Sequence, residues 1–569
     1  MAAESAYADR ITTMLNMERK RWLLVILSAL LQIAIFPIAG PVPAWRSALA
    51  YLAVMPLLAA VLGEDESGCG PSLRSVYLLG YVCGVIWYAG NCYWICPTMN
   101  IYGNLPLSAA FGVLMLYSLI LANYHAIFCV VVSMVRRRLD GVAGALLAAP
   151  VIWVAVELAR TRITGIPWDM LGTAQVDNLL LDRIAPWTSV CGMSFVIVAV
   201  NALLAGALLL RGAVAKRWLV AGLVVATVLL GGGAIASRVA RPEVPRQTAV
   251  LLQENLEVGQ GMQLRSGFHS VGEMYQSFER LTMQPPIDGY AAQRTVSSMP
   301  PSRLIVWPES PAPFEVPEQG FMAQMESLAR YEKTPIIAGA ITVIPDASTV
   351  HHFRIYNSAA FFAPDGTPAG RYDKIHLVPW GEYIPYRQVF FFARTLTDQV
   401  EDFERGTVRN VFRVDGHTYG TFICYESVFP DEVRHFAANG AQVLVNISND
   451  GWYGDTSAPW QHLNMARMRA IENQRWILRD ANTGVTGSID PEGRLHDVAP
   501  RHERTALVAG FNYEDDVTFY SRHGDLFAWA CLLATLVLCG TALVPRISCK
   551  SVKDASLENQ GAERRSAGA

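Results

Sequence analysis

Three polar residues follow hydrophobic runs at points where strands are expected to end. Glu309 closes "LIVWPE", Lys374 lies in "RYDKIHLVPWGEYIP", and Cys424 closes "GTFIC". A cysteine in such a position could be a nucleophile, and a carboxylate and an ammonium group are side chains that can assist one. Taken singly, each has a simpler explanation, because a glutamate can be a solvated cap, a lysine a surface charge and a cysteine a packed core residue.

Cys424 is the only one of ten cysteines in the polar segment that runs from about 240 to 520. In an oxidising compartment, a cysteine without a partner is either deeply buried or retained for its reactivity. The stretch "CYESVFPDEVRHF" predicts a strand end, a tight turn and a helix start. Backbone N–H groups in such a turn can lower a thiol pKa and bind an oxyanion.

The polar segment alternates short hydrophobic runs with helical patterns, which predicts an α/β layered domain over 247–512. Several runs are continuously apolar, as is typical of strands covered on both faces. We expect strands within 248–256, 303–310, 334–343, 357–366, 420–427 and 441–451, and helices near 319–332, 429–439 and 459–474. In such sheets, active-site residues collect at the carboxyl ends of strands.

The rest of the chain is strongly apolar and predicts eight membrane-spanning helices, since about 20 apolar residues cross a bilayer. The expected spans are 22–39, 47–63, 76–97, 107–135, 142–159, 188–210, 217–236 and 525–545. They divide the chain into a cytoplasmic N-terminus (1–21), a seven-helix domain (22–237), the polar domain (247–512), an eighth helix (525–545) and a disordered cytoplasmic tail (546–569).

Clusters of basic residues indicate the orientation, because they favour the cytoplasmic side. Such clusters precede the first span (19–21) and follow the fourth (136–138), the sixth (211–217) and the eighth (546–565). All four clusters are cytoplasmic if the N-terminus is inside. Seven spans then place the polar domain outside, which is the periplasm of a bacterium with two membranes.

Ionisable residues inside the spans are sparse, with His125 and Glu157 as the examples. A transporter usually carries more charge at membrane depth, so the spans predict an anchor or a platform facing lipid. For His125, Asn91, Asn123 and Asn201 we expect hydrogen bonds between helices.

Composition and motifs argue against several classes of ligand. The net charge of −3 and the lack of a basic patch with interleaved aromatics argue against nucleic acid as a partner. No residue spacing typical of a metal site or a phosphate loop is present, and the histidines at 351–352 and 462 have no partners at useful intervals. We therefore expect no metal and no cofactor.

Longer motifs carry a resemblance to a known family. The Glu309, Lys374 and Cys424 motifs resemble the triad of the nitrilase, or carbon–nitrogen hydrolase, superfamily. "YDKIHLVPWGEYIP", "ICYES", "NISNDGWYGDTSAPWQHLNMARMRAIENQRW" and "RDANTGVTGSIDPEG" are similar to bacterial apolipoprotein N-acyltransferases, as is "GIPWDMLG". The resemblance implies an eight-helix membrane domain with a nitrilase-like α-β-β-α sandwich between its last two helices.

The resemblance also implies a reaction with two half-reactions. Cys424 would take an acyl chain from a membrane phospholipid and form a thioester. The free α-amine of a diacylglyceryl-modified N-terminal cysteine on an apolipoprotein would then accept the chain. Glu309 would act as general base and Lys374 as oxyanion donor. We expect a monomer in the bacterial inner membrane, with its catalytic domain in the periplasm.

Five further residues are candidates for supporting roles. By the resemblance, Glu382 is a second essential glutamate, although it could instead form a structural ion pair with Lys374. Tyr425 and Glu426 follow the nucleophile and could be catalytic or part of the framework. Trp452 could form a wall of the acyl pocket, and Trp380 could contact lipid; for both, core packing is the alternative.

Two other functions are compatible with parts of the sequence. A membrane-tethered amidase of the nitrilase type would hydrolyse a small amide with the same triad, but it would not need eight spans. A transporter or receptor with an outer binding domain would need more charge in its spans than this chain carries.

Overall fold

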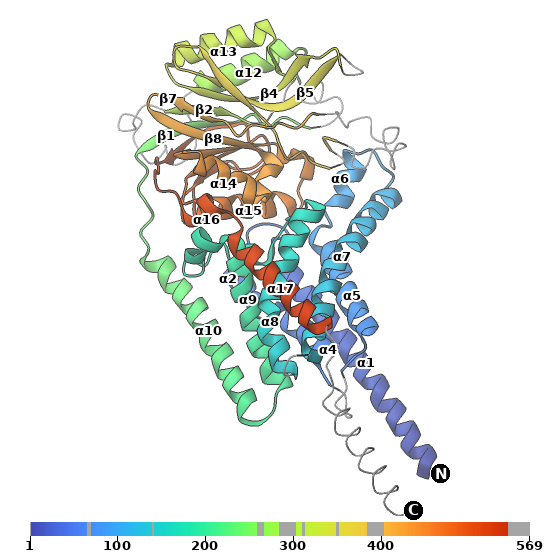
Figure 1. Cartoon of the computed structure of the whole chain (residues 1–569). Coiled ribbons are helices and arrows are strands. Elements are labelled where there is room, and N and C mark those ends of the chain that lie inside the picture. The colour runs from blue at the N-terminus through green and yellow to red at the C-terminus, as the bar shows by residue number, and fades with distance from the viewer. Residues whose placement is uncertain are drawn as a thin grey trace, which may run out of the picture.

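Two β-sheets stack face to face above a bundle of long helices (Figure 1). The computed structural model describes residues 2–543 except 65–69, 139–140, 259–266, 284–302, 310–312, 349–351, 380 and 384–402. Trp380 and the tail 546–569, for which the sequence analysis makes predictions, therefore lie outside the described residues.

The first sheet has the strand order β13-β1-β2-β4-β5-β6, with β3 paired to β4. Its strands are β1 (Gln247–Gln253), β2 (Leu304–Trp307), β3 (Glu315–Val316), β4 (Ile336–Pro345), β5 (Phe353–Phe362), β6 (Pro368–Asp373) and β13 (Thr505–Phe511). The central strands β1, β2 and β4 are parallel. The Pro-Asp-Gly turn joins antiparallel β5 and β6, and Gly366 takes the positive φ of 84° that this turn requires.

The second sheet has the order β12-β11-β10-β9-β8-β7. Its strands are β7 (Val411–Val414), β8 (His417–Ile423), β9 (Val443–Ser448), β10 (Ile477–Ala481), β11 (Gly487–Ile489) and β12 (Leu495–Val498). Strands β8, β9 and β10 are parallel, so their carboxyl ends meet at one edge.

Helices cover the outer face of each sheet. Helices α12 (Val271–Met283) and α13 (Gln319–Glu332) pack on the first sheet, and α14 (Pro430–Ala438) and α15 (Ala458–Asn473) on the second. Successive side chains of a strand point to opposite faces of the sheet, so each sheet can pack against the other sheet and against helices. Leu251 and Val306 face the second sheet, whereas their neighbours Leu252 and Trp307 face α12 and α13. The predicted α-β-β-α layering and its helices are confirmed.

The helical part contains five stretches that are long and apolar enough to cross a membrane, within the described residues: Ala44–Leu62, Leu107–Arg138, Gly141–Thr164, Asp182–Leu209 and Gly212–Val239. They match five of the eight predicted spans. The other three predicted spans fall in α1 (Ala2–Ala34), α5 (Leu73–Asn91) and α17 (Leu526–Leu543), which do not meet the same criteria. The predicted count of eight is therefore not confirmed.

The bundle is assembled from several further elements: α2 (Ala44–Ala48), α3 (Ala50–Ala53), α4 (Met55–Leu62), α6 (Ile95–Ile101), α7 (Leu107–Arg138), α8 (Gly141–Ala159), the π-helix η1 (Arg160–Thr164), η2 (Leu171–Gln175), η3 (Asp182–Ile184), α9 (Ala185–Leu209) and α10 (Gly212–Val239). The predicted hydrogen bonds between helices are present. Asn201 accepts from the backbone N–H groups of Val54 and Met55 at 2.8 Å each, and His125 lies 3.1 Å from the Gln32 amide oxygen.

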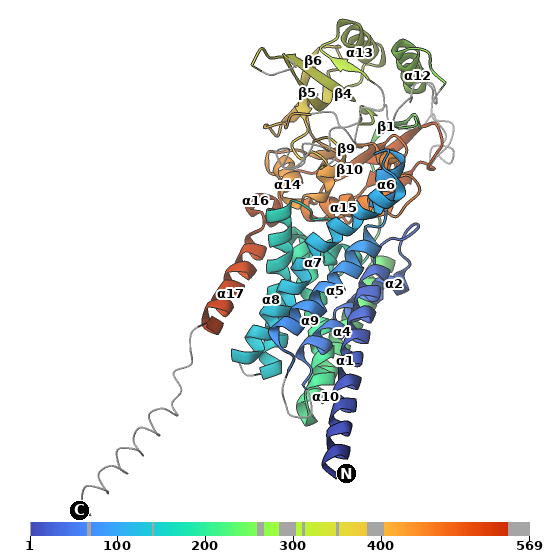
Figure 2. The same ribbon diagram turned by 90° about the vertical axis from the view of Figure 1, so that its right-hand side faces the viewer.

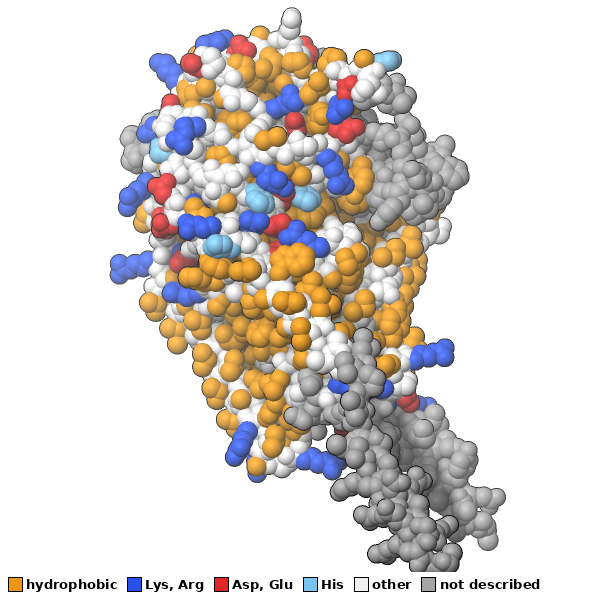
Figure 3. Space-filling model, in the orientation of Figure 1, with side chains coloured by type: hydrophobic (Ala, Val, Ile, Leu, Met, Phe, Trp, Pro, Cys, Tyr) orange, Lys and Arg blue, Asp and Glu red, His pale blue; other side chains and the backbone are white. Residues whose placement is uncertain are grey.

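The layer of α14 and α15 faces the bundle, as both ribbon views show (Figures 1 and 2). Helix α10 leads up to β1, and the short helix α16 (Phe519–His523) leads from the sandwich into α17, which runs back along the bundle. Hydrophobic side chains cover the visible side of the bundle, while charged ones gather over the sandwich (Figure 3). Arg162 of η1, in the bundle, forms ion pairs with Asp431 of α14 (2.8 Å) and with Asp525 directly before α17 (2.5 Å). These ion pairs connect the bundle to the sandwich and to the start of the last helix.

Candidate active site

The structure brings Glu309, Lys374 and Cys424 to one edge of the sandwich. Glu309 lies two residues after β2, Lys374 directly after β6, and Cys424 directly after β8. All three are buried, with 6%, 1% and 5% of their surface exposed. Because the strands belong to both sheets, stacking of the sheets is what assembles this cluster.

Lys374 occupies the centre of a hydrogen-bonded cluster. Its Nζ lies 3.0 Å from Glu309 Oε1 and 2.8 Å from Glu382 Oε1. Asn357 of β5 donates to both carboxylates at 2.8 Å, and the backbone N–H of Asn449 donates to Glu309 Oε2 at 2.8 Å. Glu382 thus forms the ion pair with Lys374 that the sequence analysis left open. Asn357 was missed, although a lone amide in the apolar run "YNSAAFF" is a usable signal.

The charges around Cys424 act in opposite directions on its ionisation. Burial raises the pKa of the Cys424 thiol, Glu309 raises it further, and Lys374 lowers it. Burial opposes the charge on Lys374, but Glu309 and Glu382 hold the pKa of its ammonium above the ordinary value. At rest the cluster therefore pairs a protonated thiol with an ionised lysine, and a base must remove the thiol proton.

Cys424 also has an unusual backbone conformation. It begins the 3-10 helix η7 (Cys424–Val428) with a φ of 49°, in the left-handed region that non-glycine residues rarely adopt. Such a conformation costs roughly 1–3 kcal/mol and persists only where neighbouring contacts maintain it.

Glu426 is held by hydrogen bonds from four neighbouring residues. Its buried carboxylate accepts from the Tyr372 hydroxyl (2.8 Å) and from the backbone N–H groups of Ile375 (2.7 Å), His376 (3.1 Å) and Ile423 (2.7 Å). Burial raises the pKa of Glu426 to about 7, whereas the backbone donors lower it. These bonds tie the turn after β8 to the loop that carries Lys374.

Tyr425 and Trp452 both face the helical bundle. The Tyr425 hydroxyl lies 3.5 Å from the Gly165 carbonyl oxygen, and its ring stacks on Trp168 at 6.5 Å. Trp452 is 39% exposed and meets Tyr102 edge to face at 5.5 Å.

His462 does have partners, contrary to the sequence analysis. One of its ring nitrogens, an Asp450 carboxylate oxygen and the Cys424 sulfur lie within 4.8 Å of one another, and all three residues are buried. These are metal-ligand types, but they are already engaged. Nδ1 lies 2.9 Å from Asp450 Oδ1, Nε2 lies 3.0 Å from the Cys424 carbonyl oxygen, and Arg479 pairs with Asp450 at 2.7 Å. Burial opposes ionisation of Asp450, but Arg479 and His462 hold its pKa below the usual range. The arrangement fits a hydrogen-bond network.

A cavity of about 280 Å³ opens beside Tyr425, between the bundle and the sandwich. Its charged lining comprises Arg162, His376, Arg405, Asp431, Glu432 and Asp525. The acids are paired: Arg162 binds Asp431 and Asp525, and His376 lies 3.0 Å from Glu432. Within the described residues Arg405 has no carboxylate partner and instead stacks 5.0 Å above Tyr383.

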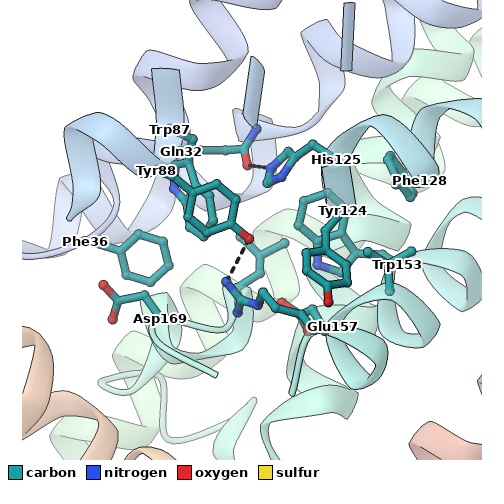
Figure 4. A pocket seen from close by; sticks show the side chains of 13 residues that line it. Gln32, Phe36, Trp87, Tyr88, Tyr124, His125, Phe128, Trp153, Glu157 and Asp169 are labelled. Atoms are coloured by element: carbon teal, nitrogen blue, oxygen red, sulfur yellow. Dashed lines mark hydrogen bonds between the residues drawn. The ribbon is translucent and has the colours of Figure 1, made fainter. Parts of the chain in front are cut away.

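A second, smaller cavity of about 30 Å³ lies inside the bundle (Figure 4). Arg160, which directly follows the predicted span 142–159, is buried here. It donates to the Tyr88 hydroxyl (3.3 Å) and lies over Trp87, near Glu157 and Asp169. The bundle thus buries more charge than predicted.

Comparison with known proteins adds independent information. Residues 28–203 match the family model described as the apolipoprotein N-acyltransferase N-terminal domain, and residues 259–515 match that of carbon-nitrogen hydrolase. A relative named apolipoprotein N-acyltransferase from Geobacter metallireducens is 34% identical over 533 residues, which cover 92% of this chain and 95% of that protein. The chain belongs to the apolipoprotein N-acyltransferase family.

Two other relatives with the same name agree. The protein from Methylococcus capsulatus is 32% identical over 84% of this chain and 89% of its own length. The one from Chlorobaculum tepidum is 29% identical over 95% of this chain and 99% of its own length. The matches span the helical bundle and the sandwich, so the amidase alternative is not favoured for this member of the N-acyltransferase family.

The charges around Cys424 generate a test by alkylation. Replacing Glu309 by Gln removes a negative charge that raises the thiol pKa, so carboxamidomethylation of Cys424 should become faster at a given pH. Lys374→Met removes the opposing cation, so alkylation should become slower. Peptide-resolved mass spectrometry after iodoacetamide pulses at several pH values measures both.

Arg371→Gln is the matched control, because Arg371 lies on β6 and forms a partly exposed ion pair with Asp373. Shifts of the same sign in Glu309→Gln and Lys374→Met would contradict the described electrostatics.

Proposed function

We propose that this protein moves an acyl chain from a membrane phospholipid to the α-amine of the lipidated N-terminal cysteine of apolipoproteins, through a thioester on Cys424. The observation that carries the proposal is the buried cluster of Glu309, Lys374 and Cys424 at the edge of the sandwich nearest the bundle. A site at this contact suits substrates that are themselves held in a membrane.

In the first half-reaction, Glu309 accepts the Cys424 proton and the thiolate attacks the ester carbonyl carbon of the phospholipid. Lys374 and the backbone N–H that follows Cys424 stabilise the tetrahedral oxyanion. The bond from carbon to the glycerol oxygen breaks. The proton on Glu309 passes to that oxygen, and a lysophospholipid leaves.

In the second half-reaction, the free amine of the apolipoprotein attacks the thioester carbonyl. Glu309 accepts a proton from the amine, the carbon–sulfur bond breaks, and the Cys424 thiolate regains a proton. The product carries an amide. Glu382 supports Lys374 in both steps, since removal of either carboxylate would leave the buried ammonium with one partner fewer. Tyr425, Trp452 and Trp380 would contact substrate or lipid.

We also propose that eight helices cross the membrane and that the sandwich lies on its outer side. Helices α1, α5 and α17 would add three spans to the five apolar stretches, giving seven before the catalytic domain (247–512) and one after it. A 19-residue helix such as α5 is about 28 Å long, close to the thickness of the hydrocarbon core. The turn between α9 and α10 lies at the end of the bundle away from the sandwich (Figure 1), as a basic cytoplasmic loop requires. The sandwich would then lie in the periplasm, and we expect a monomer in the inner membrane.

The proposed mechanism predicts that the acyl-enzyme forms even when no acceptor is present. The purified protein, mixed with phospholipid in detergent, should release a burst of about one lysophospholipid per enzyme and then stop, because the thioester awaits an amine. Liquid chromatography with mass spectrometry counts the product. Cys424→Ala should release none, and Glu309→Gln should release it at least about 100-fold more slowly. Steady release without an acceptor would show that water resolves the thioester and would contradict transfer to an amine.

The cavity beside Tyr425 suggests how the phospholipid is held. Its one cation without a carboxylate partner in the described part of the chain is Arg405, and a phosphodiester lies a glycerol away from the scissile ester. Arg405 is therefore suited to bind the donor phosphate by charge-assisted hydrogen bonds.

Arg405→Gln should raise the KM for phospholipid by about tenfold, as expected for loss of one charged contact. It should leave acylation by p-nitrophenyl palmitate, which has no phosphate, unchanged. The matched control is Arg413→Gln on β7, an exposed arginine outside the cavity. Equal losses with both donors would contradict phosphate binding by Arg405.

A further inference from the structure

Gln461 and His462 are neighbours in the first turns of α15, and both are fully buried. Their neighbours along the chain do not reveal what either side chain contacts. In the structure the two side chains point to different parts of the protein: His462 contacts the nucleophile, and Gln461 contacts the helical bundle.

His462 holds the peptide group that follows the nucleophile. A carbonyl oxygen can only accept, so His462 Nε2, 3.0 Å from the Cys424 oxygen, carries the proton and donates it. The other ring nitrogen lies between Asp450 Oδ1 (2.9 Å) and an Arg479 nitrogen (3.1 Å). Ser448 donates to the same Asp450 oxygen at 2.8 Å. These contacts fix the orientation of the imidazole ring.

This bond bears directly on the proposed oxyanion site. In a trans peptide the C=O of one residue and the N–H of the next point in opposite directions in one plane. Fixing the Cys424 carbonyl therefore fixes the direction of the Tyr425 N–H. As the second residue of η7, Tyr425 has no acceptor for this N–H within that helix. The positive φ of Cys424 needs such a contact to persist.

Gln461 anchors the same turn of α15 to the bundle. Its Nε2 donates to the backbone oxygens of Asn91 (3.0 Å) and Pro37 (3.2 Å), and its Oε1 accepts from Trp168 Nε1 at 2.9 Å. Asn91 ends α5, and Pro37 follows α1. The Asn91 side chain also donates to Asp169 at 2.8 Å. Three separate segments of the bundle thus determine where α15 begins.

We propose that Gln461 and His462 are positioning residues for the reaction proposed above: Gln461 anchors α15 to the bundle, and His462 uses that anchor to aim the Tyr425 N–H at the oxyanion. Neither side chain touches the acyl group. The acyl-transfer step should therefore depend on contacts made by the membrane part of the protein.

Acylation of Cys424 by p-nitrophenyl acetate, followed by stopped flow, tests this in the full-length protein. His462→Leu removes the donor to the Cys424 carbonyl, and the maximal acylation rate should fall about 100-fold, as for loss of an oxyanion contact. The concentration giving half-maximal rate should change little. His462→Gln, whose Nε2 can replace the ring donor, should recover most of the rate. Gln461→Leu should slow acylation about tenfold.

Iodoacetamide alkylation of Cys424 distinguishes a positioning role from a general structural role. Alkylation needs no oxyanion donor, so it should stay normal if only the oxyanion contact is lost. It should fall together with acylation if the site as a whole is disturbed. All three variants should be alkylated at the wild-type rate, even where the loss of buried hydrogen bonds lowers the melting temperature. Asn464→Ala, on the same helix but bonded to Arg467, is the matched control and should acylate normally.

Wild-type acylation by His462→Leu would overturn the positioning role, and so would parallel losses of acylation and alkylation. Wild-type acylation by Gln461→Leu would overturn the anchoring role, even if His462→Leu did not fold. Failure of the wild-type protein to transfer its acyl group onward from Cys424 would count against the proposed function alone.

Discussion

A lysine buried between two carboxylates is the constraint on which the site depends. Lys374 is 1% exposed, and an ammonium group can be removed from water only if opposite charges and hydrogen bonds replace the lost hydration. Glu309 arrives from the end of β2 and Glu382 from the loop after β6, and Asn357 of β5 joins the two carboxylates. Removing one partner of such a buried cluster typically costs about 3–5 kcal/mol, so the sheets must stack in this register.

The same cluster sets the state of the nucleophile. Lys374 lowers and Glu309 raises the pKa of a thiol that burial already keeps protonated. A carboxylate held by two hydrogen bonds and an ammonium group is well placed to take a proton and return it, while the ammonium remains available to an oxyanion. Both proposed half-reactions use this arrangement. Glu309 takes a proton from the Cys424 thiol in the first and from the acceptor amine in the second.

Much of the fold was predictable because its signals are local. Continuous apolar strands, the Pro-Asp-Gly turn and the three amphipathic helices follow from neighbouring residues, and the polar residues at strand ends identified the cluster around Lys374. The contacts of His462 could not be predicted, because its partners Cys424, Asp450 and Arg479 lie 38, 12 and 17 residues away along the chain. The burial of Arg160 was also not predicted. Hydropathy ends the predicted span at residue 159, but η1 continues α8 through Arg160 in the structure. Spans 22–39, 76–97 and 525–545 rest on composition, and α1, α5 and α17 do not meet the same criteria of length and hydropathy.

A single-turnover chase can follow one acyl chain from the phospholipid through Cys424 to the acceptor amine. The protein is first loaded with a phospholipid that carries an isotope-labelled acyl chain, excess donor is removed, and a synthetic diacylglyceryl-cysteine peptide is added. Intact-protein and peptide mass spectrometry then follow the label with time. The label should reside on Cys424 as a hydroxylamine-sensitive thioester and move to the peptide α-amine at the rate at which the thioester disappears. Label that reaches the peptide in a Cys424→Ala protein, or that leaves Cys424 only as free fatty acid, would rule out transfer through a Cys424 thioester.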